Sequence, residues 1–382
     1  MIVLNSTADY KVRGFSYPDF PLLTWTKTDE ALEIEAGMLF EEGHEFLNYF
    51  LLKRGRVASK RTWDAYAQHM SSFFSFCEDN DQDWKEISDD GENEMLLSVY
   101  RDVCIQDFKL SVNSTNQYLR TIIKFYQYAV GQGWVAALPY ALESVRASSN
   151  KHAFLAHAVS GTNEVYSPDI MMTMTKIPVK FLQTEEIQIL LKAIKNPTLK
   201  LMVRLCLQTG IRKKELLFFP LDAIRKTRPN EKTCRVDINR TKGEKERSID
   251  IPVRLMNDLW GYVNELRFQQ QEASGVVSNY LFLTTEGKER CEGASFNNEL
   301  RKLNLPFKVN PHKLRHTYAT HMLKGLQKSK SSKFEPLMYL QSRLGHSSIT
   351  TTMRYLHVIN DLLDDVSLEY QDSINAIDEL EG

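Results

Sequence analysis

The sequence predicts a mostly α-helical protein with two domains, a helical domain followed by an α+β domain that holds a small antiparallel sheet among its helices. The chain has 382 residues, more than one ordinary hydrophobic core accommodates. Apolar residues recur at helical spacing along most of it. Strand-like alternation is found in two short neighbouring runs, CRVDINRT at 234–241 and RSIDIP at 247–252, which a turn joins into a hairpin.

The composition is that of a globular protein in water, with 42% hydrophobic and 25% charged residues. No apolar run reaches the length of about 18 residues that a membrane span needs. The opening MIVLNSTADYK lacks a basic leader followed by an apolar stretch, so a signal peptide is not expected. We therefore expect a cytoplasmic protein without a membrane partner.

The cysteines give no sign of a disulfide framework or a thiolate zinc site, because they are odd in number, scattered and never spaced as CxxC. We expect them to be reduced residues of the core. They are Cys77, Cys104, Cys206, Cys234 and Cys291.

The net charge of −1 hides an asymmetry along the chain. Beyond Tyr355 there are eight acidic residues and no Lys or Arg, which leaves 48 basic against 41 acidic residues in 1–355, a net charge of +7. Residues 300–333 hold nine Lys or Arg and no acid. A basic body with an acidic tail fits a polyanionic partner such as nucleic acid, although an ordinary solvated face has the same composition.

The first domain is expected to be helical over residues 58–145. Residues 1–57 are treated as an N-terminal extension, with a Pro-interrupted opening that predicts an ordered arm or a short strand pair. One helix is predicted over 60–78, and a second begins at a Ser114/Thr115 cap and ends at Gly131 and Gly133. The apolar stripe of the first helix is a core face rather than a platform for stacking bases. Its residues are Tyr66, Met70, Phe73, Phe74 and Cys77.

Residues 146–177 lose periodicity and are predicted to be a linker between domains. The second domain spans residues 178–382 and opens on a helix capped by Thr184. At its end, apolar residues at four-residue spacing predict a C-terminal tail helix, which packs either on its own domain or on a neighbouring copy. They are Leu362, Val366, Tyr370 and Ile374.

A polar pair stands on the helix that Asn310 caps and Pro311 begins, in the segment NPHKLRHTYATHML. His312 and Arg315 are three residues apart and share a face near the helix N-terminus, where a phosphate is favoured. A plain surface face explains the same residues. So does a zinc site at three histidines of this helix, but no ligand motif such as HExxH accompanies it. Those histidines are His312, His316 and His321.

Three further polar residues lie upstream. Arg212 follows a helix that ends at Gly210, and Glu215, three residues later, can hold the guanidinium in a fixed orientation for bidentate contact with phosphate oxygens. Alone, the two residues are equally well explained as a structural ion pair. Lys242 lies in the predicted hairpin turn and can reach away from the sheet.

In order along the chain, these residues resemble the site of the tyrosine recombinase (phage integrase) family. The likeness rests on TGIRKKELL, INRTKGEKERSIDIP, HKLRHTYATHML and LGHSSITTTMRYLHV, which cover about residues 178–358. It implies a helical core-binding domain, an α+β catalytic domain of the tyrosine recombinase type, and two domains that clamp duplex DNA. It also implies a homotetramer on specific recombination sites, with DNA-bending proteins as possible accessory partners.

The resemblance implies that Tyr355 attacks a DNA phosphodiester and becomes a 3′-phosphotyrosine, so that no ATP is needed. Arg212 and Arg315 would bind the non-bridging oxygens, each contributing on the order of 3 kcal/mol to the transition state. Lys242 would protonate the leaving 5′ oxygen.

Further roles are implied for three residues and for the basic surface. His312 would exchange a proton with Tyr355, His346 would donate a hydrogen bond to the phosphate, and Glu215 would support Arg212. No metal or other cofactor is expected. The residues expected to contact DNA are Lys213, Lys245, Arg247, Lys313, Lys328 and Lys330.

The sequence favours a site-specific recombinase of a mobile element, acting in integration, excision or transposition. One departure is the Lys/Ser-rich stretch at 322–343, which is longer than in most members and predicts a loop against the DNA backbone. Two other classes stay open. A non-catalytic DNA-binding regulator of the same fold is expected to have lost a site residue, and a type IB topoisomerase shares the chemistry but relaxes supercoils as a monomer.

Overall fold

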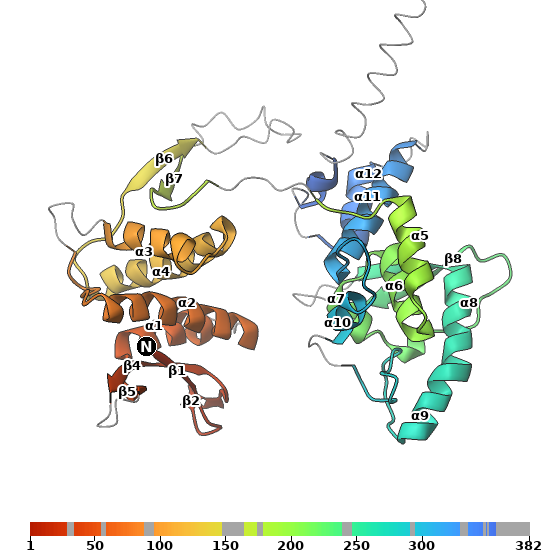
Figure 1. The fold of residues 1–382 in the computed structure, drawn as a ribbon, viewed down its shortest axis with the longest axis horizontal. Helices are drawn as coiled ribbons and strands as arrows, with labels where there is room; N and C mark the ends of the chain where they lie inside the picture. The colour runs from red at the N-terminus through yellow and green to blue at the C-terminus, as the bar shows by residue number, and fades with distance from the viewer. Residues whose placement is uncertain are drawn as a thin grey trace, which may run out of the picture. The chain divides into compact units, whose positions relative to one another are not determined.

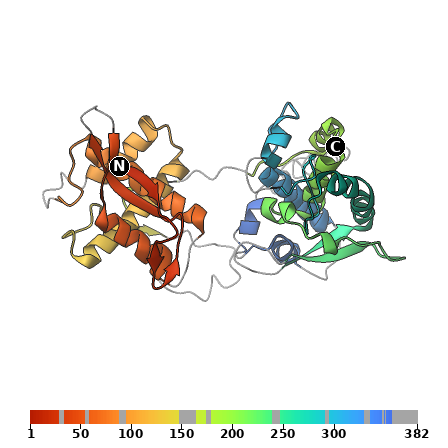
Figure 2. The same cartoon turned by 90° about the horizontal axis from the view of Figure 1, so that it is seen from below.

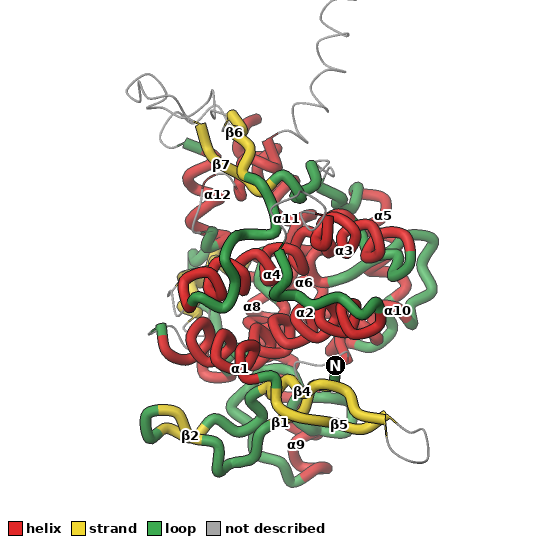
Figure 3. Tube along the Cα trace, turned by 90° about the vertical axis from the view of Figure 1, so that its left-hand side faces the viewer, coloured by secondary structure: helices red, strands yellow, loops and turns green. Residues whose placement is uncertain are grey.

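The chain folds into two compact units, Met1–Lys176 and Ile177–Gly382. The structure is a computed structural model, and most of its backbone is helical (Figure 3). It describes residues 1–28, 34–54, 59–87, 95–146, 164–173, 179–238, 247–290, 295–328, 335–346, 349 and 351–356.

The first unit begins with strands. A three-stranded antiparallel sheet has the order β1-β4-β5, and a short hairpin, β2 with β3, is inserted between its first two strands. Val12 and Phe15 pair across the hairpin, and the turn residues Arg13 and Gly14 both have positive φ, as a two-residue hairpin turn requires. The strands are β1 (Ile2–Asn5), β2 (Lys11–Val12), β3 (Phe15–Ser16), β4 (Pro21–Thr28) and β5 (Ile34–Leu39).

Helices follow the strands in this unit (Figure 1). The second predicted helix begins earlier than expected, because Ser111 rather than Ser114 is the N-cap and accepts from the Ser114 amide at 3.2 Å. It ends at Gly133, which has φ +74°. The helices are α1 (Glu41–Asn48), the π-helical turn η1 (Tyr49–Lys53), α2 (Lys60–Asp79), α3 (Met95–Gln106) and α4 (Val112–Gln132).

Residues 1–28 and 34–54 are part of the helical unit, whereas the sequence suggested a separate extension over 1–57. In Figure 2 the red strands lie across the helices of this unit. Phe20, Leu23 and Phe40 are fully buried and share one core with Phe74 of α2 and Phe125 of α4. The expected stripe of α2 does face this core, so the first unit is an α+β unit and not an all-helical one.

Part of the predicted linker is also ordered. β6 (Leu142–Arg146) pairs with β7 (Glu164–Pro168) in an antiparallel ladder that joins Leu142 to Pro168 and Arg146 to Glu164. Ile170 follows this ladder and is buried in the core of the first unit. The described part of the segment therefore belongs to that unit.

The second unit consists of helices around the predicted hairpin. β8 and β9 pair antiparallel from Thr233–Pro252 to Ile238–Arg247, and their residues alternate between buried and less buried positions. Its elements are α5 (Thr184–Ala193), α6 (Pro197–Thr209), α7 (Lys213–Leu217), the short 3-10 turn η2 (Leu221–Ala223), β8 (Thr233–Ile238), β9 (Arg247–Pro252), α8 (Val253–Tyr262), the π-helical turn η3 (Val263–Arg267), α9 (Phe268–Ser274), α10 (Ser295–Arg301), α11 (Pro311–Lys328), α12 (Pro336–Leu344) and helical residues 351–356.

Two apolar clusters hold this unit together. The larger one packs α6, the hairpin and α8 around residues such as Met202, Ile251 and Leu259. The smaller one joins α11 and α12 and contains Tyr318, Leu344 and Tyr355. The mostly α fold with small antiparallel sheets agrees with the prediction.

Two remaining expectations concern the cysteines and the membrane. Cys77, Cys104, Cys206 and Cys234 are buried and unbridged, while Cys291 lies outside the described residues. Of the helices that the structure describes, none combines the length and the apolar character needed to cross a bilayer.

Candidate active site

The site begins where α6 ends. Gly210 terminates this helix with φ +63°, and two residues later Arg212 is the N-cap of α7. Glu215 caps the start of α7, because its carboxylate accepts from the Arg212 backbone amide at 2.9 Å, and it also accepts from Arg212 Nη1 at 2.8 Å. The expected Arg212–Glu215 pair is therefore built into the first turn of a helix.

Glu215 binds a second arginine as well. Arg247, the first residue of β9, donates from Nη2 to Glu215 Oε2 and from Nε to Oε1 at 3.3 Å. Glu215 is 3% exposed, and burial alone would raise its pKa. The hydrogen bond and charge of Arg247, followed by the contacts from Arg212, hold that pKa below its usual value, so the carboxylate is ionised between two cations.

Arg247 was expected on a DNA-binding surface, and the structure corrects this placement. It is 8% exposed, and its third nitrogen, Nη1, donates to the backbone oxygen of Arg343. Arg247 therefore lies inside the site, in contact with Glu215 and with the end of α12, and not on an exposed basic surface.

The second arginine of the predicted pair comes from α11. Asn310 caps this helix by accepting from the Lys313 amide at 2.8 Å, as its sequence predicts. Arg315, one turn later, is 5% exposed and donates to the Gly210 oxygen at 2.6 Å and to the Leu344 oxygen at 2.5 Å. Burial, followed by the charges of Arg212 and Arg247, lowers the pKa of Arg315 to about 9.

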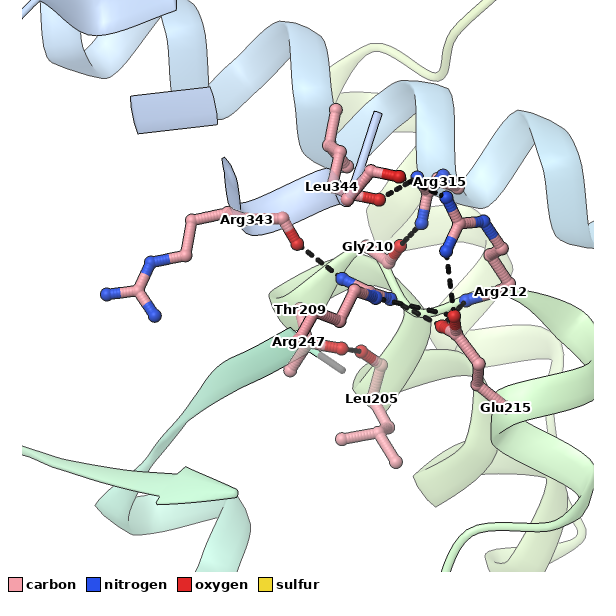
Figure 4. A network of polar contacts seen from close by, with 10 residues as sticks. Leu205, Thr209, Gly210, Arg212, Glu215, Arg247, Arg315, Arg343 and Leu344 are labelled. Atoms are coloured by element: carbon pink, nitrogen blue, oxygen red, sulfur yellow. Dashed lines mark hydrogen bonds and ion pairs between the residues drawn. The ribbon is translucent and has the colours of Figure 1, made fainter. Parts of the chain in front are cut away.

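Figure 4 shows Arg212, Arg315, Glu215 and Arg247 gathered between α6, β9 and the end of α12. Arg212 completes this arrangement by donating from Nη2 to the Gly345 oxygen at 2.7 Å. Three guanidinium groups thus gather in one place with a single buried carboxylate, which contacts two of them. The excess of positive charge makes the site suitable for an anion such as a phosphodiester.

Tyr355 is one of the helical residues 351–356 and lies close to this cluster. It is 3% exposed and packs with Tyr318 and Leu344, so it is a core aromatic by its ring. Its hydroxyl has a polar partner, His316 Nδ1, at 2.8 Å. Burial raises the pKa of Tyr355, while the charges of Arg315 and Arg354 lower it.

The histidine that contacts the phenol is His316 and not the expected His312. The ring of His312 lies 4.0 Å from that of His316, centroid to centroid, one helical turn earlier on α11. Burial, followed by the charge of His312 and of Arg354, lowers the pKa of His316 to about 3. The imidazole is therefore neutral near pH 7. The sequence did contain a signal, since the two histidines are four residues apart on one helix face.

His346 follows Gly345 directly and lies beside the same tyrosine. Its ring is parallel to that of Tyr355 within 6° at a centroid distance of 6.3 Å. Its Nδ1 lies 2.9 Å from the hydroxyl of the fully buried Thr352, which fixes the ring. Burial, followed by Arg315 and Arg212, lowers the pKa of His346 to about 4.

Comparison with known proteins identifies the family to which this site belongs. Residues 180–361 match the phage integrase family. The tyrosine recombinase XerD of Staphylococcus saprophyticus is 24% identical over 325 residues, 82% of this chain and 92% of that protein. The tyrosine recombinase XerC of Staphylococcus epidermidis is 27% identical over 293 residues, 72% of this chain and 90% of that protein. The chain belongs to the tyrosine recombinase family. It is accordingly an enzyme of DNA strand breakage and rejoining.

Solved structures show that the recombinase also shares its fold with this family. The XerH recombinase bound to its difH substrate after cleavage has a TM-score of 0.56 at 18% identity, covering 84% of this chain and 82% of that one. The Tn1549 transposon integrase in complex with a circular intermediate DNA has a TM-score of 0.53 at 16% identity, covering 82% of this chain and 94% of that one.

Several predicted residues of the recombinase lie where the structure gives no placement. Lys242, Lys245 and Lys330 are outside the described residues, as is the tail helix expected around 362–374. The expected loop over 322–343 is mostly helical instead: residues 322–328 belong to α11 and residues 336–343 to α12, while residues 329–334 are outside the described residues. Lys328 ends α11, and its side chain is not described.

Two of the basic residues expected to meet DNA are placed. Lys313 lies 4.0 Å from Glu186 and above the Phe307 ring at 5.6 Å. Lys213 opens α7 directly after Arg212.

The alternative of a zinc site on α11 finds no support in the geometry. His321 Nε2 contacts the Leu182 backbone oxygen at 2.8 Å, whereas Nδ1 of His316 contacts Tyr355. Among the described residues no group of three or more His, Cys, Asp or Glu side chains is placed to hold a metal ion.

Proposed function

We propose that this tyrosine recombinase cuts and rejoins DNA at specific sites through a covalent 3′-phosphotyrosine on Tyr355. The observation that supports this most directly is the placement of Tyr355, in polar contact with His316 and within the electrostatic influence of the buried Arg315. We further propose that it acts as a homotetramer on double-stranded DNA in the bacterial cytoplasm, in integration, excision or transposition of a mobile element.

The proposed step exchanges one phosphorus–oxygen bond for another. The Tyr355 oxygen attacks the phosphorus, and the bond from phosphorus to the 5′ oxygen breaks. The phenol proton passes to His316 Nδ1, and the departing 5′ oxygen takes a proton from Lys242, the residue implied by the family. Arg212 and Arg315 would hold the non-bridging oxygens while their charge increases, with His346 as a further donor.

A bound phosphate would strengthen His316 as the proton acceptor. In the free protein, burial and the neighbouring cationic and imidazole groups lower the pKa of His316 to about 3, which makes it a weak base. A phosphodiester between the arginines would offset part of that positive charge and raise this pKa. The base would therefore gain strength when DNA is in place.

The test is the capture of the covalent intermediate. Fragmented genomic DNA of the source organism is incubated with the protein, the protein is denatured, and fragments that remain attached are sequenced to identify the site. A duplex of that site with a nick near the cleavage point then traps the adduct. We expect wild type, and not Tyr355→Phe, to become attached to the 3′ end. An adduct formed by the Phe variant would refute Tyr355 as the nucleophile.

The same substrates separate the other two classes. Exchange of strands between two sites is expected of a recombinase. Relaxation of a supercoiled plasmid without exchange would instead support a type IB topoisomerase, and binding without any adduct would support a regulator of the same fold.

A further inference from the structure

The last carbonyl groups of α12 bind three different arginines. Helix C-termini leave their final carbonyl oxygens without partners inside the helix, and they carry partial negative charge. Here the oxygen of Arg343 accepts from Arg247, that of Leu344 from Arg315 at 2.5 Å, and that of Gly345 from Arg212 at 2.7 Å. Each of three consecutive carbonyls is therefore matched to one guanidinium of the site.

Arg247 is the member of this set that joins the two ends of the network. It contacts both oxygens of Glu215, which in turn orients Arg212, and it contacts the end of α12 through the Arg343 oxygen. Only 4% of its side chain is exposed. A buried guanidinium forms stable contacts only where each donor has an acceptor. Arg247 and its partners therefore hold one another in place.

Two further features tie α12 to β9 beside this residue. The Arg343 side chain pairs with Asp250 of β9 at 2.5 Å. Gly345 has φ +60°, and a β-carbon there would lie 2.7 Å from Arg247 Cδ. The absence of a side chain at this position is what allows the Arg247 stem to pass.

From this geometry we propose that Arg247 is a positioning residue, which holds Arg212 and Arg315 at their working separation through Glu215 and the end of α12. The proposal rests on the recombinase function proposed above. It adds that the position of α12 determines whether the arginines are placed for the reaction. The chain runs directly from the end of α12 to His346 and, nine residues later, to Tyr355. A displacement of this end would withdraw three acceptors from three arginines at once, so the readiness of the site depends on where α12 lies.

The test compares Arg247→Gln and Arg247→Lys with wild type in cleavage of the nicked substrate, with DNA in saturating excess so that each active protein molecule is trapped after a single turnover. Arg235→Gln is the matched control, because Arg235 is on β8, is exposed, and has Ser248 Oγ as its hydrogen-bond partner at 3.0 Å. A misplacement of about 1 Å can cost on the order of 100-fold in rate. We expect a loss of that size for Arg247→Gln and a smaller one for Arg247→Lys, which keeps the charge but not the fork.

Rate and final yield of adduct distinguish positioning from folding. A variant that merely folds less well gives less adduct at the wild-type rate constant, because each folded molecule is intact. A positioning defect gives a lower rate constant with the same final yield and with an apparent Kd for DNA within about 3-fold of wild type. The control should match wild type in all three quantities.

Two results would overturn this inference without touching the proposed function. One is a wild-type adduct together with rate constants for both Arg247 variants within about 3-fold of wild type. The other is a lower yield with an unchanged rate constant in both variants. If wild type itself forms no adduct, the proposed function fails instead.

Discussion

The hydroxyl of Tyr355 and Nδ1 of His316 lie 2.8 Å apart on two helical segments that pack in the same apolar cluster. A buried phenol needs a hydrogen-bond partner, and a neutral imidazole can accept its proton. The contact therefore serves two purposes. It satisfies the hydroxyl in the free protein, and it places a proton acceptor on the atom proposed to attack DNA.

The first prediction separates the two neighbouring histidines of α11. We expect His316→Ala to lower the single-turnover rate of adduct formation about 100-fold, the scale of general base catalysis. His312→Ala should have a smaller effect, because its ring contacts His316, and it is His316 that contacts the phenol. Rates of adduct formation on the nicked substrate show which of the two histidines accepts the proton. A larger loss in His312→Ala than in His316→Ala would contradict this assignment.

The second prediction concerns stability in acid. The pKa values of His316 and His346 are lowered to about 3 and about 4 in the folded state, against an ordinary value near 6.5. Between those values the unfolded chain binds more protons, so the free energy of unfolding should fall as the pH drops from about 6.5 to about 4. The slope is at most about 1.4 kcal/mol per pH unit for each histidine.

Trp260 can report this change, because it is the only tryptophan beyond residue 177. Urea unfolding of protein labelled with fluorotryptophan is followed at its resonance at several pH values. His316→Gln and His346→Gln should each make the pH dependence shallower. An unchanged slope in both variants would mean that other titratable groups cause the pH dependence of stability.

The third prediction concerns the buried Arg315. Arg315→Ala leaves the oxygens of Gly210 and Leu344 without their charged donor, which should destabilise the second unit by about 3 kcal/mol and abolish cleavage. Arg315→Lys keeps a charge but reaches only one of the two oxygens, so we expect an intermediate loss of stability. The same fluorotryptophan unfolding measures both variants. Equal stability of the Ala variant and wild type would show that the two hydrogen bonds contribute nothing.

Local sequence signals predicted the parts of this site that depend on local contacts. The cap at Asn310 and the pair of Arg212 with Glu215 are formed within three residues of chain, and both are present as expected. Helical periodicity likewise found the buried face of α2, and alternation at a period of two residues found the strands of the hairpin.

The parts that sequence missed depend on distant contacts. Arg247 lies in a charged segment, two residues after Lys245, and looks like a surface residue, but its partners Glu215 and Arg343 are 32 and 96 residues away. His316 is 39 residues from Tyr355. The strand β7 was hidden for the same reason, because its pairing with β6 spans a stretch without apolar periodicity.

The fourth prediction tests the close packing at the end of α6. Gly210 has φ +63°, and a β-carbon there would lie 2.3 Å from Tyr318 Cδ1. Gly275 at the end of α9 has φ +66° but no atom within 4 Å of such a carbon. Both Ala variants should lose about 1 kcal/mol to backbone strain. Gly210→Ala should lose about 1–3 kcal/mol more, because Tyr318 must move.

Cleavage adds a second readout to this pair. The Gly210 oxygen accepts from Arg315, so a shift of the turn should also slow adduct formation. Gly275→Ala should cleave at the wild-type rate. Equal stability of the two variants would show that Tyr318 accommodates the added carbon.

The last prediction tests whether the N-terminal strands belong to the helical unit. Phe20 is fully buried against the rings of Tyr10, His44 and Trp63, whereas Phe15 on the β2–β3 hairpin is 70% exposed. Phe20→Ala removes a large buried ring and should cost about 3–5 kcal/mol. Phe15→Ala, the matched control, should change stability by less than about 0.5 kcal/mol.

Tryptophan fluorescence in urea measures this effect, because four of the five tryptophans lie in the first unit, including Trp84 and Trp134 of its helical part. We expect Phe20→Ala to shift their transition to lower urea. Trp84 packs against Phe40 and Phe125, so the shift must reach it if strands and helices unfold together. A transition that stays in place would instead mark residues 1–57 as an extension on a helical domain that is stable without it.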